Sequence, residues 1–138
     1  MNNLYYIIPE LFISLCVMFL LVLGVFKNNS SKIIFYFSYL IILVSLAINL
    51  NIKLPEKIFL FNNSYTVDDL SLFIKTIILI SAFFVMFSSH NYVKVNNILK
   101  IEYPILILCS LLGMLVMISS NDLIVFYIGL ELQSLALY

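Results

Sequence analysis

The sequence predicts an all-α membrane protein with about five transmembrane helices, and three observations support this. The chain is 64% hydrophobic, only 10% of its 138 residues are charged, and its mean hydropathy is +1.14. Soluble proteins are about 45–50% apolar and about 25% charged. The apolar residues also form runs separated by polar connections. These runs must be helices, because isolated strands would leave unpaired backbone groups in lipid.

Each apolar run is judged by its length, since a span needs about 20 mainly apolar residues, with a range of about 17–25. The predicted helices cover residues 4–26, 33–50, 70–88, 103–119 and 123–138. The connections at 27–32 and 119–122 are short enough to allow only antiparallel neighbours. No internal repeat or domain boundary interrupts the chain, so residues 1–138 are taken as a single transmembrane unit.

Several residues are typical of helix starts. The connection over residues 51–69 contains turn-forming residues and ends in Asp68 and Asp69, either of which is expected to cap the next helix. Asp122 is expected to cap the last helix. Pro104 fits the first turn of its helix, where its missing N–H is harmless.

The lysines predict the orientation of the chain in the membrane and exclude nucleic acid as a partner. The seven basic residues are all lysine, the net charge is zero, and no basic cluster suits nucleic acid. The first and third connections hold more lysines than the second, which predicts that they face the cytoplasm or matrix. The lysines of the first and third connections are Lys27, Lys32, Lys94 and Lys100, and those of the second are Lys53 and Lys57.

Glu131 is the main candidate for function, because it is a carboxylate within the apolar run 123–138. A charge at the bilayer centre costs about 2.5–3.5 kcal/mol on insertion scales. Such a residue favours a proton-transfer site, and the alternative is a carboxylate that only holds helices together through a lysine. Gly129 and Ala136 would let a neighbouring helix approach closely.

The other polar residues carry weaker expectations. Lys75 is an accessory polar residue, expected to reach back to the surface or to Asp68, with a direct Glu131 pair not favoured. Glu10 is expected to anchor its helix near the membrane interface, and the less favoured alternative is a proton site. His90 is expected to be solvated. We expect no catalytic, metal or cofactor site in this chain.

Three stretches go beyond composition. Residues 102–106 read EYPIL, residues 112–123 read LGMLVMISSNDL, and residues 126–138 read FYIGLELQSLALY. Together they closely resemble subunit 2 of the respiratory NADH:ubiquinone oxidoreductase (complex I), an antiporter-like membrane-arm subunit. The run GLELQSLALY is the most specific part, and the entry into the helix carrying Lys75 is similar as well.

The resemblance implies a fold and a role. The chain would be the N-terminal part of a 14-helix antiporter-like fold, and Glu131 would match the family's proton-transfer glutamate, which faces a lysine on a later helix. That lysine is not in this sequence. The expected partners are the lipid bilayer, other complex I membrane-arm subunits and a separate chain carrying the remaining helices. NADH, FMN, iron–sulfur clusters and ubiquinone would be bound elsewhere in the complex.

The composition and the abrupt end of the last run add two expectations. Many Ile, Asn, Phe and Lys residues, with no Arg or Trp, favour an AT-rich genome. We therefore expect a split mitochondrial form in the inner membrane. The alternative location is a bacterial inner membrane, and the alternative to a split form is an ordinary subunit of which this sequence is a part. The competing functions are a purely structural assembly subunit and a part of a related cation/proton antiporter or membrane-bound hydrogenase.

Overall fold

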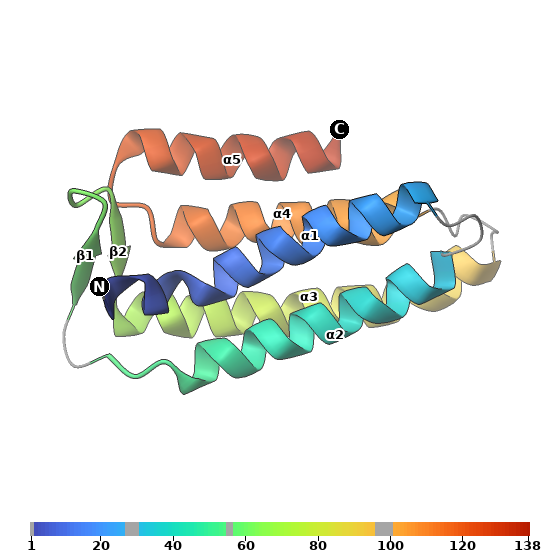
Figure 1. Ribbon diagram of the computed structural model, residues 1–138, viewed down its shortest axis with the longest axis horizontal. Helices are drawn as coiled ribbons and strands as arrows, with labels where there is room; N and C mark the ends of the chain where they lie inside the picture. Colours follow the sequence, from blue (N-terminus) through green and yellow to red (C-terminus); the bar gives the residue numbers. More distant parts are fainter. Residues whose placement is uncertain (1, 27–30, 55–56, 96–100) are drawn as a thin grey trace.

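The computed structural model describes residues 2–26, 31–54, 57–95 and 101–138, and in them five α-helices form a bundle with a β-hairpin at one end (Figure 1). In chain order the elements are the 3-10 helix η1 (Asn2–Ile7), α1 (Ile8–Phe26), α2 (Ser31–Asn51), β1 (Ile58–Leu60), β2 (Tyr65–Val67), α3 (Asp69–Val95), α4 (Glu102–Ile118) and α5 (Leu123–Leu137). The prediction of an all-α membrane protein is confirmed.

Helix length separates the helices into two groups. In the part of the chain that the structure describes, three segments are long and apolar enough to cross a membrane, namely Tyr5–Phe26, Ile33–Asn51 and Asp69–His90, whereas α4 and α5 are shorter apolar helices. α3 continues to Val95, past the predicted end at residue 88. Residues 27–30 and 96–100 lie outside the described residues, and they hold Lys27 and Lys100, two of the six lysines used for the orientation.

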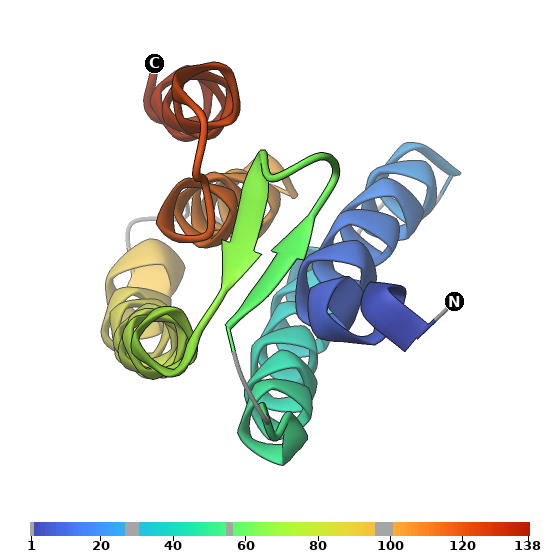
Figure 2. The ribbon, with the colours of Figure 1, turned by 90° about the vertical axis from the view of Figure 1, so that its left-hand side faces the viewer.

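Helices α1 to α4 enclose the core, and α5 packs along the outer side of α4 (Figures 1 and 2). Seen from the hairpin end, α5 is the outermost helix and α4 lies between it and the rest of the bundle (Figure 2). The core side chains are aliphatic or aromatic and come from all four inner helices: Ile13, Leu20, Phe35, Ile42, Leu79, Met86, Leu108, Leu111 and Leu115.

The α4–α5 contact depends on two glycines. A Cβ atom at Gly129 would lie 2.9 Å from the carbonyl oxygen of Gly113 and 3.0 Å from the backbone nitrogen of Met117. A Cβ atom at Gly113 would lie 2.7 Å from the carbonyl oxygen of Gly129. The two backbones therefore touch where neither residue has a side chain, as predicted for Gly129.

The hairpin was not predicted. Its strands pair antiparallel, with Ile58 opposite Val67 and Leu60 opposite Tyr65. Asn62 and Asn63 turn the chain with positive φ angles of 54° and 70°, which asparagine tolerates better than most residues. Strands of three residues are too short to show the alternation of apolar and polar residues that predicts a strand. The sequence therefore predicted only the turn residues.

The hairpin lies across the end of the bundle and is fastened to the α4–α5 loop (Figure 2). The Thr66 N–H donates to the Ser119 carbonyl oxygen at 2.8 Å, and the Asn121 N–H donates to that of Ser64 at 3.0 Å. The Asn121 side-chain amide also donates to the Asn63 carbonyl oxygen at 2.7 Å. The start of α5 is thereby tied to the hairpin.

The predicted caps have different outcomes. The Ser71 N–H donates to the Asp68 carboxylate at 2.8 Å, and the Asp68 N–H donates to the Ser71 hydroxyl at 2.9 Å, so Asp68 caps α3 as predicted. Pro104 lies in the first turn of α4, as predicted. Asp122 occupies the N-cap position of α5, as predicted, but its side chain makes no capping hydrogen bond there.

The prediction of a solvated His90 is also wrong. Its ring is half-buried and packs 4.9 Å from the Phe35 ring, measured between centroids, with Tyr36 at 6.1 Å and Tyr39 at 6.5 Å. These aromatic residues come from α2, opposite the far part of α3. The polar neighbours of His90 in sequence gave no sign of this packing.

Candidate functional site

A buried ion pair joins α1 to α3. The Lys75 ammonium lies 2.6 Å from Oε1 of Glu10, and the two side chains are only 1% and 5% exposed. Glu10 lies in the first turn of α1, and Lys75 lies in the second turn of α3. Because both helices start at the hairpin end of the bundle, the two charges meet at the same depth.

The hairpin completes this cluster. The Tyr65 hydroxyl donates to Oε1 of Glu10 at 3.0 Å and accepts from the Lys75 ammonium at 3.3 Å. Burial, and then the Glu10 carboxylate, raise the pKa of Tyr65, while the nearby Ser119 hydroxyl lowers it by a smaller amount. Tyr65 therefore stays protonated and acts as a donor to Glu10.

Two oxygen atoms of this cluster lack a hydrogen-bond partner among the described residues. Oε2 of Glu10 and Oγ of Ser119 are buried and make no hydrogen bond of good geometry with any described residue. A buried polar atom without a partner usually costs about 1–3 kcal/mol. The cluster is thus well satisfied at Oε1 of Glu10 and unsatisfied at Oε2.

The prediction for Lys75 is wrong, because its side chain is buried against Glu10 and does not reach the surface or Asp68. The prediction that Glu10 lies near the membrane interface stays a prediction; the ion pair with Lys75 was not expected. Opposite charges in a low-dielectric interior pair with each other, and helix starts at one end of a bundle bring them together. The sequence contained this signal, because both residues follow closely on the starts of helices that enter from the same side.

Glu131 lies in a different environment. It is half-buried near the middle of α5 and makes no ion pair with any described residue. Tyr127 lies one helical turn earlier in α5, on the same face as Glu131. Much of α5 faces away from the bundle, with Ile128 56% exposed and Leu135 67% exposed.

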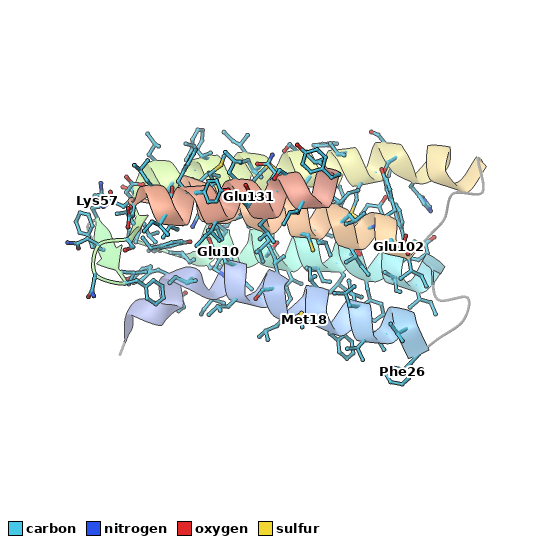
Figure 3. The ribbon with its side chains drawn as sticks, turned by 90° about the horizontal axis from the view of Figure 1, so that it is seen from above. Glu10, Met18, Phe26, Lys57, Glu102 and Glu131 are labelled. Atoms are coloured by element: carbon cyan, nitrogen blue, oxygen red, sulfur yellow. The ribbon has the colours of Figure 1, made fainter. Side chains whose placement is uncertain are left out.

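The two carboxylates do not meet. Figure 3 looks onto α5 and shows Glu131 part-way along it, whereas Glu10 lies on α1, near the end that also carries Lys57. α4 separates α5 from the other helices (Figure 2). Lys75 is already paired with Glu10, so the ion pair and Glu131 form two separate polar centres.

The chemistry available at both centres is proton handling. A carboxylate can take up and release a proton, and a buried lysine and tyrosine can hold it in place through hydrogen bonds. Among the described residues, no three His, Cys, Asp or Glu side chains gather as metal ligands would. The grooves along α5 are lined mainly by apolar residues such as Leu106, Leu132 and Leu135.

Comparison with known proteins gives the family, although no family model matches the chain. The chain is similar to NADH-quinone oxidoreductase subunit N of three bacteria. For Pelagibacter ubique (strain HTCC1062) the identity is 54% over 138 residues, covering 100% of this chain and 29% of the relative. For Paramagnetospirillum magneticum (strain ATCC 700264 / AMB-1) it is 40% over 137 residues, covering 96% and 27%. For Maricaulis maris (strain MCS10) it is 37% over 138 residues, covering 99% and 29%.

These relatives confirm the predicted family, since subunit N is the counterpart of subunit 2. The chain spans less than a third of the length of the relatives it matches. The chain is a homologue of NADH-quinone oxidoreductase subunit N along its whole length and corresponds to an N-terminal part of that subunit.

Proposed function

We propose that this chain is the N-terminal part of the proton-translocating membrane-arm subunit of respiratory complex I, which couples NADH oxidation and quinone reduction to proton movement. The relatives are named as subunits of an NADH-quinone oxidoreductase, and they match the whole chain. The apolar helices suit a multi-pass position in an inner membrane. The bacterial origin of these relatives favours a bacterial inner membrane over a mitochondrial one.

The observation that carries this proposal is the carboxylate of Glu131 in α5. Glu131 lies within an apolar helix and forms no ion pair with any described residue. An ionisable group in such a place usually handles protons or pairs with a group on another helix. Glu131 would exchange a proton, and its charge would be balanced by a lysine from a later part of the subunit.

The exposed apolar side of α5 supports the proposal that further helices of the subunit pack against it. Apolar side chains such as Leu123 and Leu137 are 82% and 75% exposed, because α5 lies at the edge of the bundle and no described element covers its outer side. We propose that the remaining helices of the family's sequence cover this face, either in the same polypeptide or in a separate chain. The split mitochondrial form remains a prediction.

The redox chemistry is proposed to lie in other subunits. NADH, FMN, iron–sulfur clusters and ubiquinone would bind elsewhere in the complex, and other membrane-arm subunits would contact this chain. Lys75 would act only through Glu10, because its ammonium already contacts that carboxylate. The contribution of this chain is the membrane path of the proton.

The test is Glu131→Gln in the assembled complex, reconstituted into vesicles, with protons moved per quinone reduced as the readout. We expect normal assembly and a strong loss of proton translocation. Glu102→Gln is the matched control, because it makes the same change at an exposed carboxylate at the start of α4 (Figure 3). Normal translocation by assembled Glu131→Gln complex would contradict the proposal and favour a structural assembly role.

A further inference from the structure

The Glu10 cluster is a second place in this chain where a proton can be held. Its members are Glu10, Lys75, Tyr65 and Ser119, from α1, α3, β2 and the end of α4. We propose that this cluster is a proton-exchange site at the hairpin end of the membrane domain, with the proton held on Oε2 of Glu10 and passed to water beside Ser119. This proposal rests on the proposed function and adds a residue set to it.

The first argument is the asymmetry of the Glu10 carboxylate. Oε1 accepts from both Lys75 and Tyr65, at 2.6 Å and 3.0 Å, whereas Oε2 is buried and has no partner among the described residues. A group that served only to join α1 and α3 would be more stable with both oxygens satisfied. The free oxygen is where a proton can be added without breaking either existing hydrogen bond.

The second argument is the position of Ser119. Its hydroxyl is fully buried, lies near the Tyr65 hydroxyl and has no hydrogen-bond partner of good geometry among the described residues. A buried water needs two to four polar partners. Oε2 of Glu10 and Oγ of Ser119 would supply two of them, one as an acceptor and the other as a donor or an acceptor.

The third argument is the short way to the surface. Ser119 is followed by the half-buried Ser120 and the exposed Asn121, which is bonded to the hairpin turn. The hairpin turn itself, with Asn62 and Asn63, is exposed. The cluster is therefore separated from the aqueous phase by one loop and one hairpin and not by a whole helix length.

The proton step balances without a co-reactant. A hydronium ion arriving from the loop gives one proton to Oε2, so that one O–H bond breaks in the hydronium and one O–H bond forms on Glu10. Water remains, and the ion pair changes from neutral to a single positive charge on Lys75. The titratable groups that contact Glu10 in the described chain are Lys75 from α3 and Tyr65 from β2, and the neutral Ser119, just after α4, lies near Tyr65.

The test uses Ser119→Ala and Ser119→Thr in the assembled complex. We expect Ser119→Ala to lower proton translocation by about fivefold, the factor that corresponds to one lost hydrogen bond. Ser119→Thr keeps a hydroxyl and should retain most of the rate. A purely structural role predicts the opposite order, because threonine adds a methyl group at a fully buried position whereas alanine does not.

Ser120→Ala is the matched control, since it removes a hydroxyl from the next residue, where the hydroxyl already donates to the Met117 carbonyl oxygen at 2.6 Å. Proton translocation by Ser119→Ala equal to that of Ser120→Ala would overturn the proposal.

A measurement that needs no variant is a high-resolution structure of the intact complex. An ordered water within hydrogen-bond distance of both Glu10 Oε2 and Ser119 Oγ is expected, and direct apolar packing there would overturn the proposal.

The outcomes separate this proposal from the proposed function. If Glu131→Gln stops translocation while Ser119→Ala leaves it normal, the role of the Glu10 cluster is wrong and that of Glu131 stands. If assembled Glu131→Gln complex pumps normally, the proposed function itself is wrong.

Discussion

Lys75 and Glu10 form a buried ion pair whose charged atoms lie 2.6 Å apart, on two helices that start at the same end of the bundle. The hairpin covers this pair through Tyr65, and the same hairpin is bonded to the loop that leads into α5. The helix that carries Glu131 is therefore connected to the ion pair through Ser119 and Asn121, although the two carboxylates do not touch.

The ion pair should be essential for stability. Lys75→Met leaves the Glu10 carboxylate buried without its cation, and breaking a buried pair in this way costs about 3–5 kcal/mol. We expect a large drop in the unfolding temperature of the subunit within the complex. The double variant Glu10→Gln with Lys75→Met should recover much of the loss, and Lys57→Met, at an exposed position, should have little effect. Equal stability of Lys75→Met and Lys57→Met would contradict the buried pair.

Tyr65→Phe should have a smaller effect. It removes the donor to Glu10 and the acceptor for Lys75 but keeps the ring that packs in the hairpin end. Hydrogen bonds to charged groups contribute about 1.5–3 kcal/mol, so we expect destabilisation in that range. The measurement is the thermal unfolding temperature, and the control variant is Tyr5→Phe, which makes the same change on a half-exposed ring. A Tyr65→Phe protein as stable as its control would show that the hydroxyl is not engaged.

Gly129→Ala should push α5 away from α4. The new Cβ atom would meet backbone atoms of Gly113 and Met117 at 2.9 Å and 3.0 Å, and backbone cannot move aside as a side chain can. Overpacking of this kind costs about 1–3 kcal/mol. Gly24→Ala is the comparison, because the three atoms nearest its Cβ atom would belong to side chains and not to backbone, with a methyl group of Ile101 at 2.7 Å and one of Ile34 at 3.7 Å. The readout is the amount of assembled complex on native gels, and a Gly129→Ala yield no lower than that of Gly24→Ala would be inconsistent with the contact.

Asp68 should make the start of α3 sensitive to acid. Hydrogen bonding from the Ser71 N–H holds the pKa of Asp68 below its ordinary value of 3.8. A depressed pKa means that the stabilisation is present above the ordinary pKa and is lost as the pH falls through the lower, folded-state value. Protection of the Ser71 and Leu72 amides from exchange, relative to an unfolded chain at the same pH, should therefore fall below about pH 4, since carboxylates ordinarily titrate there.

The same measurement at neutral pH tests the cap itself. Asp68→Ala should accelerate exchange at the first turn of α3, because losing an N-cap costs about 0.5–2 kcal/mol. Asp69→Ala changes the adjacent, exposed carboxylate and should not do so. Identical exchange in the two variants would exclude Asp68 as the cap.

The sequence was sufficient for the features that depend on local pattern. Long apolar runs predict helices, Asp68 or Asp69 before an apolar run predicts a cap, and Gly129 predicts a close helix contact. Features that depend on tertiary pairing were not predicted. The Glu10–Lys75 pair needs two helices to be aligned, His90 needs the aromatic side of α2, and the hairpin strands are too short to show a pattern.

The most direct test of the central claim, that this chain works inside complex I, is peptide-level mass spectrometry of the native membrane complex that contains it. The account predicts that peptides of this chain co-migrate with peptides of other NADH-quinone oxidoreductase subunits and with peptides that match the rest of subunit N. A native complex that contains this chain but none of those subunits would contradict it.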